Sequence, residues 1–168
     1  MIVPHVDIVK AALGESTIRA LSLVFENSSG IPPGTPMARF RADHTELMDE
    51  LDKLGWDRFF LKRDDIKKEY RITGYALPLV DSPHAAQLLE CMSAAYEYMR
   101  DYYNEHLGES LSTWNLVNSL GKNSELVLEA FCYMQDIDGW HVGLSGGFPM
   151  DNGSIIVNEQ VRYSCLMS

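Results

Sequence analysis

In the N-terminal third of the chain, apolar residues recur at intervals of three and four positions, the spacing that predicts an amphipathic helix. The first such stretch covers residues 16–25, and Ser16 or Thr17 can cap its N-terminus. Further along, Thr35 and Pro36 predict the cap and the first residue of a short helix, because proline lacks only an N–H that has no partner at that position. The pattern therefore begins with two helices joined by a connector rich in proline and glycine.

A third helix is predicted over residues 43–54, where leucines line one face. Asp43 and Glu46 have the spacing of a capping box, in which the first side chain accepts from a backbone N–H of the first turn and the glutamate reaches back. Gly55 then supplies the left-handed residue at which many helices end.

Two extended stretches follow, at residues 58–61 and 69–73, and both contain aromatic and β-branched residues that favour strands. They flank a charged turn at residues 62–65, so the pattern predicts a β-hairpin. The cations of this segment are Arg58, Lys62, Arg63, Lys67, Lys68 and Arg71. Such a cluster is either a footprint for phosphates or simply a solvated hairpin, and the sequence leaves both interpretations open.

Three stretches carry a resemblance to a known family: Leu13-Gly14-Glu15-Ser16-Thr17-Ile18-Arg19, the leucine helix that ends in Leu54-Gly55-Trp56, and Tyr70-Arg71-Ile72-Thr73-Gly74. Together with the order helix, short helix, helix, hairpin, they resemble the winged-helix transcription-regulator superfamily over residues 15–75. In that superfamily a helix ends in Leu-x-x-x-Gly followed by an aliphatic or aromatic residue. The second strand of the wing commonly ends in a Thr-Gly type of turn.

A long helix is predicted over residues 84–106, after Ser82 and Pro83 supply a cap and a first turn. In regulators of this superfamily, linker helices of such length often mediate dimer contacts. An ordinary core helix within one subunit explains the same apolar residues, so both alternatives remain open.

The last third of the chain repeats the pattern of the first. The repeat consists of a helix over residues 111–120, a helix capped by Asn123 or Ser124, the pair Gly139-Trp140 that matches Gly55-Trp56, extended residues 140–144, the turn Asn152-Gly153 and extended residues 154–157. We interpret it as a second winged-helix-like unit, with convergence on a common motif as the alternative.

The predicted fold is therefore α+β and mainly α, with winged helix-turn-helix character. A chain of 168 residues with 46% apolar content can form one domain or two small ones. The predicted organisation is a winged-helix-like domain over residues 1–80, a linker or dimerisation helix over residues 81–108 and the second unit over residues 109–168.

The net charge of −10 is distributed unevenly along the chain. Residues 1–80 contain eleven Lys and Arg against twelve Asp and Glu, whereas residues 81–168 contain three against twelve. Because nucleic acid is held through its phosphates, only the first segment can supply a nucleic-acid contact.

The sequence contains no recognisable catalytic or metal-binding motif. Cys91, Cys132 and Cys165 are too far apart for a disulfide framework or a zinc pattern, which favours a reducing cytoplasm. The glycine-rich run at residues 144–148 lacks the Lys-Ser/Thr pair of a phosphate-binding loop. We therefore expect no enzyme activity, no cofactor and no metal site, and the lack of a long apolar run predicts no membrane association.

As a winged helix, the protein would place the third helix in the major groove of duplex DNA and the wing on phosphates, using residues 41–71. The candidate DNA-contacting residues are His44, Thr45, Met48 and Lys53 on the helix, and Lys62, Arg63, Lys67 and Lys68 on the wing. Five acids oppose the placement of the helix, because phosphates line the groove: Asp43, Glu46, Asp49, Glu50 and Asp52.

The alternative function is an acidic protein-protein interaction module that does not bind DNA. A protein partner or a second copy of the chain would then meet residues 83–106 and the acidic C-terminal half. A shared fold does not choose between the two functions, since function depends on the site rather than the scaffold.

Overall fold

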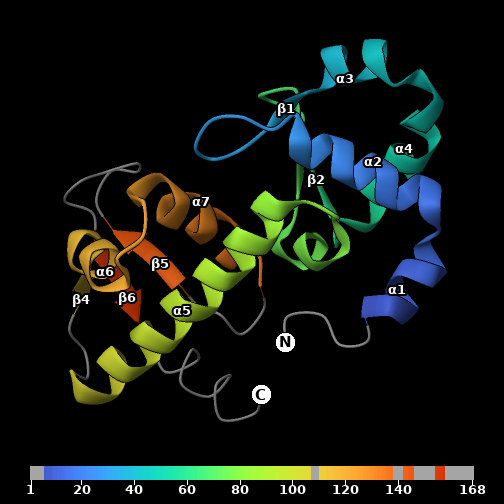
Figure 1. Cartoon of the computed structure of the whole chain (residues 1–168). Helices are drawn as coiled ribbons and strands as arrows, with labels where there is room; N and C mark the ends of the chain where they lie inside the picture. Colours follow the sequence, from blue (N-terminus) through green and yellow to red (C-terminus); the bar gives the residue numbers. More distant parts are fainter. Residues whose placement is uncertain (1–5, 107–109, 138–141, 146–153, 158–168) are drawn as a thin grey trace. The chain divides into compact units, whose positions relative to one another are not determined.

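The computed structural model describes residues 6–106, 110–137, 142–145 and 154–157, and it shows a mainly helical α+β fold with small antiparallel sheets (Figure 1). The chain divides after Ala86 into two compact units. The prediction of a mainly helical α+β chain is confirmed. The pair Gly139-Trp140 and the turn Asn152-Gly153, which the sequence also predicts, lie outside the described residues.

The first unit combines helices with one small sheet. In chain order its elements are α1 (Val6–Leu13), α2 (Glu15–Glu26), β1 (Thr35–Pro36), α3 (Met37–Asp43), a 3-10 helix (Thr45–Leu47), α4 (Met48–Asp57), β2 (Leu61–Asp64), β3 (Glu69–Ile72) and a second 3-10 helix (Gly74–Leu79). The sequence analysis did not predict α1, a helix that buries none of its side chains.

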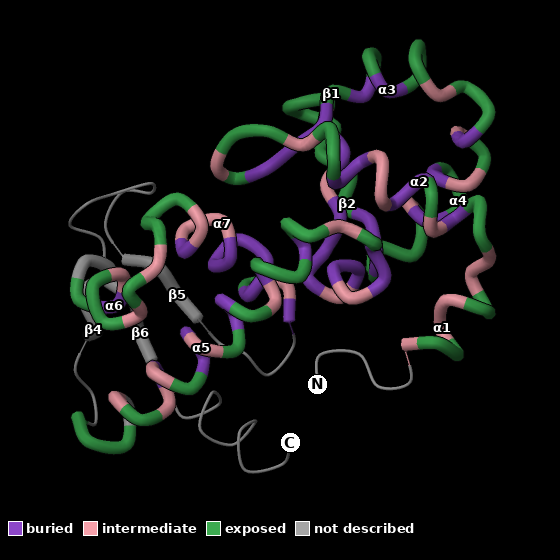
Figure 2. The backbone as a smooth tube through the Cα atoms, viewed as in Figure 1, coloured by how far each residue is buried: buried purple, intermediate pink, exposed green. Residues whose placement is uncertain are grey.

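Helix α2 packs against α1, α4 and β3, and its apolar face is buried (Figure 2). Its N-cap is Gly14, at φ +86°, rather than the predicted Ser16 or Thr17. The Thr17 hydroxyl instead donates to a carboxylate oxygen of Glu50 on α4, at 2.8 Å. The capping prediction was wrong because a tertiary contact uses the hydroxyl that a cap would need.

The three strands of the first unit form an antiparallel sheet in the order β1-β3-β2. The hairpin of β2 and β3 is confirmed, and β3 lies where the sequence predicts it, at residues 69–72 against 69–73. The first strand and the turn, predicted at residues 58–61 and 62–65, are displaced by three residues toward the C-terminus. Strand β2 begins only at Leu61, because α4 continues to Asp57, and the turn covers residues 65–68. Lys62 and Arg63 therefore belong to a strand rather than to the turn.

The boundaries of α4 differ from those that local signals predicted. Asp43 is the last residue of α3 rather than a cap, and no side chain caps the start of α4 or of the 3-10 helix before it. Gly55 lies inside α4, and the left-handed residue that follows the helix is Arg58, at φ +58°. The predicted capping box and glycine stop were wrong because α3 and the 3-10 helix occupy the residues where a cap was expected.

Thr35 joins α2 to the sheet. The backbone N–H of Ser28 donates to the carbonyl of Phe25, so the carbonyl of Val24 accepts from two hydroxyls instead: Thr35 Oγ1 at 2.6 Å and Ser28 Oγ at 2.7 Å. Thr35 also lies opposite Tyr70 in the sheet. Because Thr35 is held in strand β1, the N-cap of α3 is the next residue, Pro36, and not Thr35 as predicted.

The second unit has its own three-stranded sheet, in the order β4-β6-β5. Its elements are α5 (Pro83–Glu105), which starts just before the boundary between the units, β4 (Ser110–Ser112), α6 (Thr113–Leu120), α7 (Ser124–Met134), β5 (Val142–Ser145) and β6 (Ser154–Val157). The three predicted helices are present, but the one predicted over residues 111–120 begins only at Thr113, because residues 110–112 form β4. The Asn123 side chain caps α7, as predicted, by accepting from the N–H groups of Glu125 and Leu126.

The two units repeat one order of elements. In the first unit α2, β1, α3, α4, β2 and β3 follow one another, and in the second α5, β4, α6, α7, β5 and β6. In both sheets the strand that comes last in the sequence, β3 or β6, lies between the other two. Strand β4, which the sequence did not predict, supplies the equivalent of β1.

The double contact on the Val24 carbonyl gives the first prediction. Thr35→Val and Ser28→Ala each remove one hydroxyl, and each leaves the carbonyl one donor. The double variant leaves a buried acceptor without either donor, so we expect its loss of unfolding free energy to exceed the sum of the two single losses by about 1 kcal/mol. Urea denaturation followed by circular dichroism measures all three variants. Strictly additive losses would contradict the shared contact.

Candidate functional site

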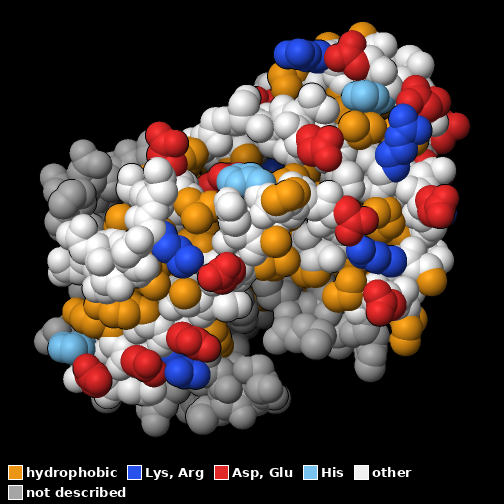
Figure 3. Space-filling view, in the orientation of Figure 1, with side chains coloured by type: hydrophobic (Ala, Val, Ile, Leu, Met, Phe, Trp, Pro, Cys, Tyr) orange, Lys and Arg blue, Asp and Glu red, His pale blue; other side chains and the backbone are white. Residues whose placement is uncertain are grey.

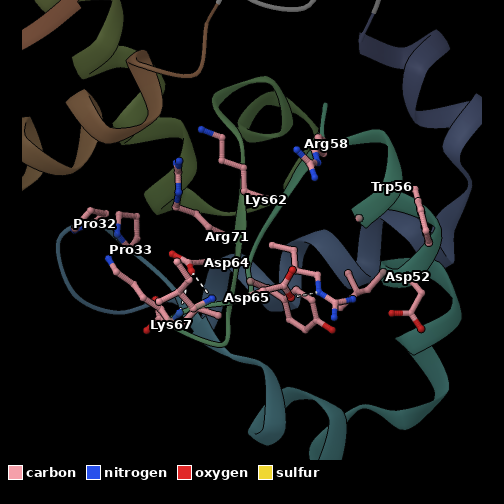
Figure 4. Close-up of a pocket in the computed structure, with 16 residues that line it drawn as sticks. Pro32, Pro33, Asp52, Trp56, Arg58, Lys62, Asp64, Asp65, Lys67 and Arg71 are labelled. Atoms are coloured by element: carbon pink, nitrogen blue, oxygen red, sulfur yellow. Dashed lines mark hydrogen bonds and ion pairs between the residues drawn. The ribbon is translucent and has the colours of Figure 1, made fainter.

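A groove of about 920 Å³ surrounds the β2–β3 hairpin of the first unit (Figure 4). Asp52 and Trp56 of α4 lie on one side of the hairpin, and Pro32 and Pro33 of the loop before β1 lie on the other. The charged residues that line the groove are the cations Arg58, Lys62, Arg63, Lys67 and Arg71 and the acids Asp52, Asp64, Asp65 and Glu69. The groove therefore offers charges of both signs, with one cation in excess.

The register of the hairpin divides these charges between its two faces. Lys62 lies directly opposite Arg71, and side chains at such opposed positions share one face. Arg63 lies opposite Tyr70 on the other face, where Leu61 is buried in the core. Arg63 therefore shares a face with the buried residues Leu61 and Tyr70, and Lys62 and Arg71 lie on the opposite face of the hairpin.

Two aspartates hold the turn of the hairpin. Asp64 Oδ1 accepts from the backbone N–H groups of Ile66, at 3.0 Å, and Lys67, at 2.9 Å. Arg63 Nε donates to Asp65 Oδ1 at 2.7 Å. This hydrogen bond lowers the pKa of the Asp65 carboxyl and raises the pKa of the Arg63 guanidinium. Both carboxylates are therefore engaged within the turn, while the side chain of Lys67 is exposed.

The side of the groove that faces α4 contains an exposed aromatic ring. Trp56, on the last turn of α4, is 90% exposed. Nearby, Arg41 of α3 places Nη2 3.6 Å from Asp52 Oδ1 and donates from the same atom to the Tyr70 hydroxyl at 3.5 Å. Residues from α3, α4 and the hairpin therefore meet on this side.

The structure brings together only part of the predicted DNA-contacting set. Lys62, Arg63 and Lys67 line the groove, and Lys68 is exposed at the turn beside it. The helix residues do not line it: His44, Thr45, Met48 and Lys53. His44 packs against Phe40, with ring centroids 4.8 Å apart, and borders a separate cavity of about 90 Å³.

Several residues of the groove were absent from the predicted site. Arg58 and Arg71 belong to the cation cluster in the sequence but not to the predicted DNA-contacting set, and both line the groove. Trp56 also lines the groove, and its place there depends on where α4 ends. In the sequence Trp56 is notable only as the residue after Gly55, the predicted helix stop. Arg41 does not line the groove, but it contacts Asp52 and Tyr70, which do.

The outer surface of α4 is acidic. In this ten-residue helix the acids are Asp49, Glu50, Asp52 and Asp57, against Lys53 as its cation. Two of its carboxylates have partners on other helices, since Asp52 pairs with Arg41 and Glu50 accepts from Thr17. On the face shown in Figure 3, acidic and basic side chains are interspersed and form no continuous basic patch.

Cys165 and residues 146–148 of the glycine-rich run lie outside the described residues. Cys91 and Cys132 are buried thiols, and burial raises the pKa of Cys91, which disfavours the reactive thiolate. Among the residues that the structure describes, no group of three or more His, Cys, Asp or Glu could hold a metal ion. Within the same residues, no helix is long and apolar enough to span a bilayer.

Comparison with known proteins assigns no family. No protein-family model, no curated protein and no solved structure matches the chain.

The ion pair in the turn gives a prediction for pH. We expect the Asp65 carboxyl to titrate below the usual aspartate pKa of about 3.9, because Arg63 donates to its charged form. The contribution of this pair to stability is then present above that value and is lost as the pH falls through the lowered pKa. Carboxyl ¹³C NMR titration measures it, and Arg63→Gln should raise the pKa while the distant Arg19→Gln leaves it unchanged. An Asp65 pKa insensitive to Arg63→Gln would contradict the pairing.

Proposed function

We propose that this protein is a non-enzymatic winged-helix protein that binds DNA through the β2–β3 hairpin, as a regulator or accessory factor. The winged-helix assignment is supported by the order helix, strand, helix, helix, hairpin and by the central position of β3 between β1 and β2. The observation that carries the proposal is the gathering of cations on one hairpin, which the rest of the chain does not repeat in its sequence. Cations gathered in this way are what phosphate binding requires.

In this proposal the hairpin contacts phosphates, and α4 does not read bases. Arg, Lys, Asn and Gln are the usual readers of base edges in the major groove, and α4 offers Lys53 among its acids. Carboxylates on a helix in the groove would also be repelled by the flanking phosphates. Contacts from Arg63, Lys67 and Lys68 to phosphates fix a position on DNA but carry little sequence information.

A second candidate function is a protein-interaction module, and a specific observation favours it. Trp56 and Ile66 line the same groove and are 90% and 95% exposed. Aromatic residues and arginine are enriched where proteins bind one another most tightly. In that case the acidic residues 81–168 would face a basic partner. Binding to DNA at low salt decides between the two functions.

Binding to random-sequence duplex DNA tests the proposal. With about four phosphate contacts, a fourfold rise in salt concentration should weaken the affinity roughly a hundredfold, because bound counterions are released from the DNA. Fluorescence anisotropy with a labelled duplex measures this at low and moderate salt. No binding at low salt would refute the electrostatic form of the proposal and leave the protein-interaction module.

A charge-matched pair of variants locates the contact. Replacing Arg63, Lys67 and Lys68 together with Gln should reduce the slope of log affinity against log salt by about three, since each lost phosphate contact removes about 0.9. The control replaces three cations that lie elsewhere in the first unit, Lys10, Arg19 and Arg39, with Gln. Equal loss in both variants would show that net charge, and not the hairpin, holds the DNA.

Helix α5 bears on the predicted homodimer. The apolar residues that made it a candidate for association, including Leu88, Met92, Ala95 and Met99, are buried within the single chain. A dimer through α5 would have to use its polar, exposed positions. We therefore expect a monomer of 19.0 kDa in size-exclusion chromatography with light scattering. A mass twice as large would contradict this expectation.

A further inference from the structure

Trp56 does not belong to the buried core of the first unit. Tryptophan is usually well buried, yet this side chain is 90% exposed. Leu51 and Leu54 supply the buried contacts of the same helix. Trp56 lies on the last turn of α4 and lines the groove, so its ring is available to a ligand there.

Two arginines near α4 line the groove, and a third contacts residues that line it. Arg58 follows the end of α4 and Arg63 lies on β2. Arg41 of α3 contacts Asp52 and Tyr70. Arg63 donates a hydrogen bond to Asp65, and Arg58 lies close enough to interact with the same carboxylate. Both arginines lower the pKa of Asp65 and so favour its charged form. A guanidinium is planar, binds phosphate through two parallel hydrogen bonds and stacks on aromatic faces.

An aromatic ring beside arginines is the chemistry that recognises unpaired nucleotides. Proteins that hold single strands combine a cationic groove for the backbone with aromatic side chains on which bases stack. In a duplex the base faces are covered by neighbouring bases, so a tryptophan ring has nothing to stack on. An apolar peptide fits less well, because nine of the sixteen residues that line the groove are charged.

We infer that the groove binds unpaired nucleotides of a nucleic acid strand, with Trp56 as the surface on which a base stacks and the neighbouring arginines as phosphate ligands. The inference rests on the proposed function and makes it more specific. The hairpin cations would hold a nucleic acid in either form, and Trp56 adds a preference for strands that are open.

Variants of Trp56 test this inference on the full chain. The probe is a fluorescein-labelled oligothymidylate of about ten nucleotides, within the site size of single-strand binders, and an oligouridylate of equal length separates DNA from RNA. Trp56→Ala and Trp56→Leu should weaken binding about tenfold or more, because both lack an aromatic face. Trp56→Phe should stay within about threefold of the wild type, since phenylalanine still stacks. Ile8→Ala, which removes an exposed apolar residue from α1, is the control and should have no effect.

A second readout distinguishes stacking from a loss of fold. A base stacked on indole quenches its fluorescence, so the oligonucleotide should quench the wild type and lose most of that effect on Trp56→Phe while still binding. Trp56-dependent binding of either oligonucleotide supports the inference. If Trp56→Ala binds the oligonucleotides as tightly as the wild type while duplex binding still depends on the hairpin cations, the inference is overturned and the proposed function stands. If neither form of nucleic acid binds, both fail.

Discussion

The carbonyl of Val24 links the end of α2 to the sheet on which the groove is built. Because the amide of Ser28 turns to Phe25, this carbonyl is left without a helical N–H and accepts from the Thr35 and Ser28 hydroxyls. Thr35 thereby fixes β1, and β1 fixes the register of β3 through Tyr70. A shift of one residue would reverse every side chain of β3 and move the hairpin cations between the core and the solvent.

The pairing of carboxylates within the hairpin reconciles the phosphate contact that we propose with the net charge of −10. Asp64 accepts from two amides of the turn, Asp65 pairs with Arg63, and Asp52 pairs with Arg41. These contacts shape the hairpin and neutralise acids that would otherwise repel phosphate. Lys67 and Lys68 of the turn are both exposed. Surface charges of this kind act over about 8–10 Å at moderate salt, so the arrangement of neighbours matters more than the net charge of the chain.

The sequence predicted most of the helices and the hairpin correctly, but it predicted poorly the residues at which they begin and end. Helical spacing located α2, α4, α5 and α7, and the mixture of aromatic and charged residues located the hairpin. The errors fall where a local signal competes with a tertiary contact: Thr35 looked like a cap but belongs to a strand, and Gly55 looked like a stop but lies inside α4. The same limit applies to the groove, since Trp56 lines it only because α4 extends to Asp57.

The repeated order of elements shows how far fold and site are independent. The strands β2 and β3 read Leu-Lys-Arg-Asp and Glu-Tyr-Arg-Ile, whereas the equivalent strands β5 and β6 read Val-Gly-Leu-Ser and Ser-Ile-Ile-Val. The second pair carries no charged residue along its strands, so it cannot present the cations that phosphate binding requires. The same order of helices and strands therefore carries charged strands in one unit and uncharged strands in the other. A phosphate contact of the kind we propose for β2 and β3 would then have no counterpart on the strands β5 and β6, because the fold does not determine the site.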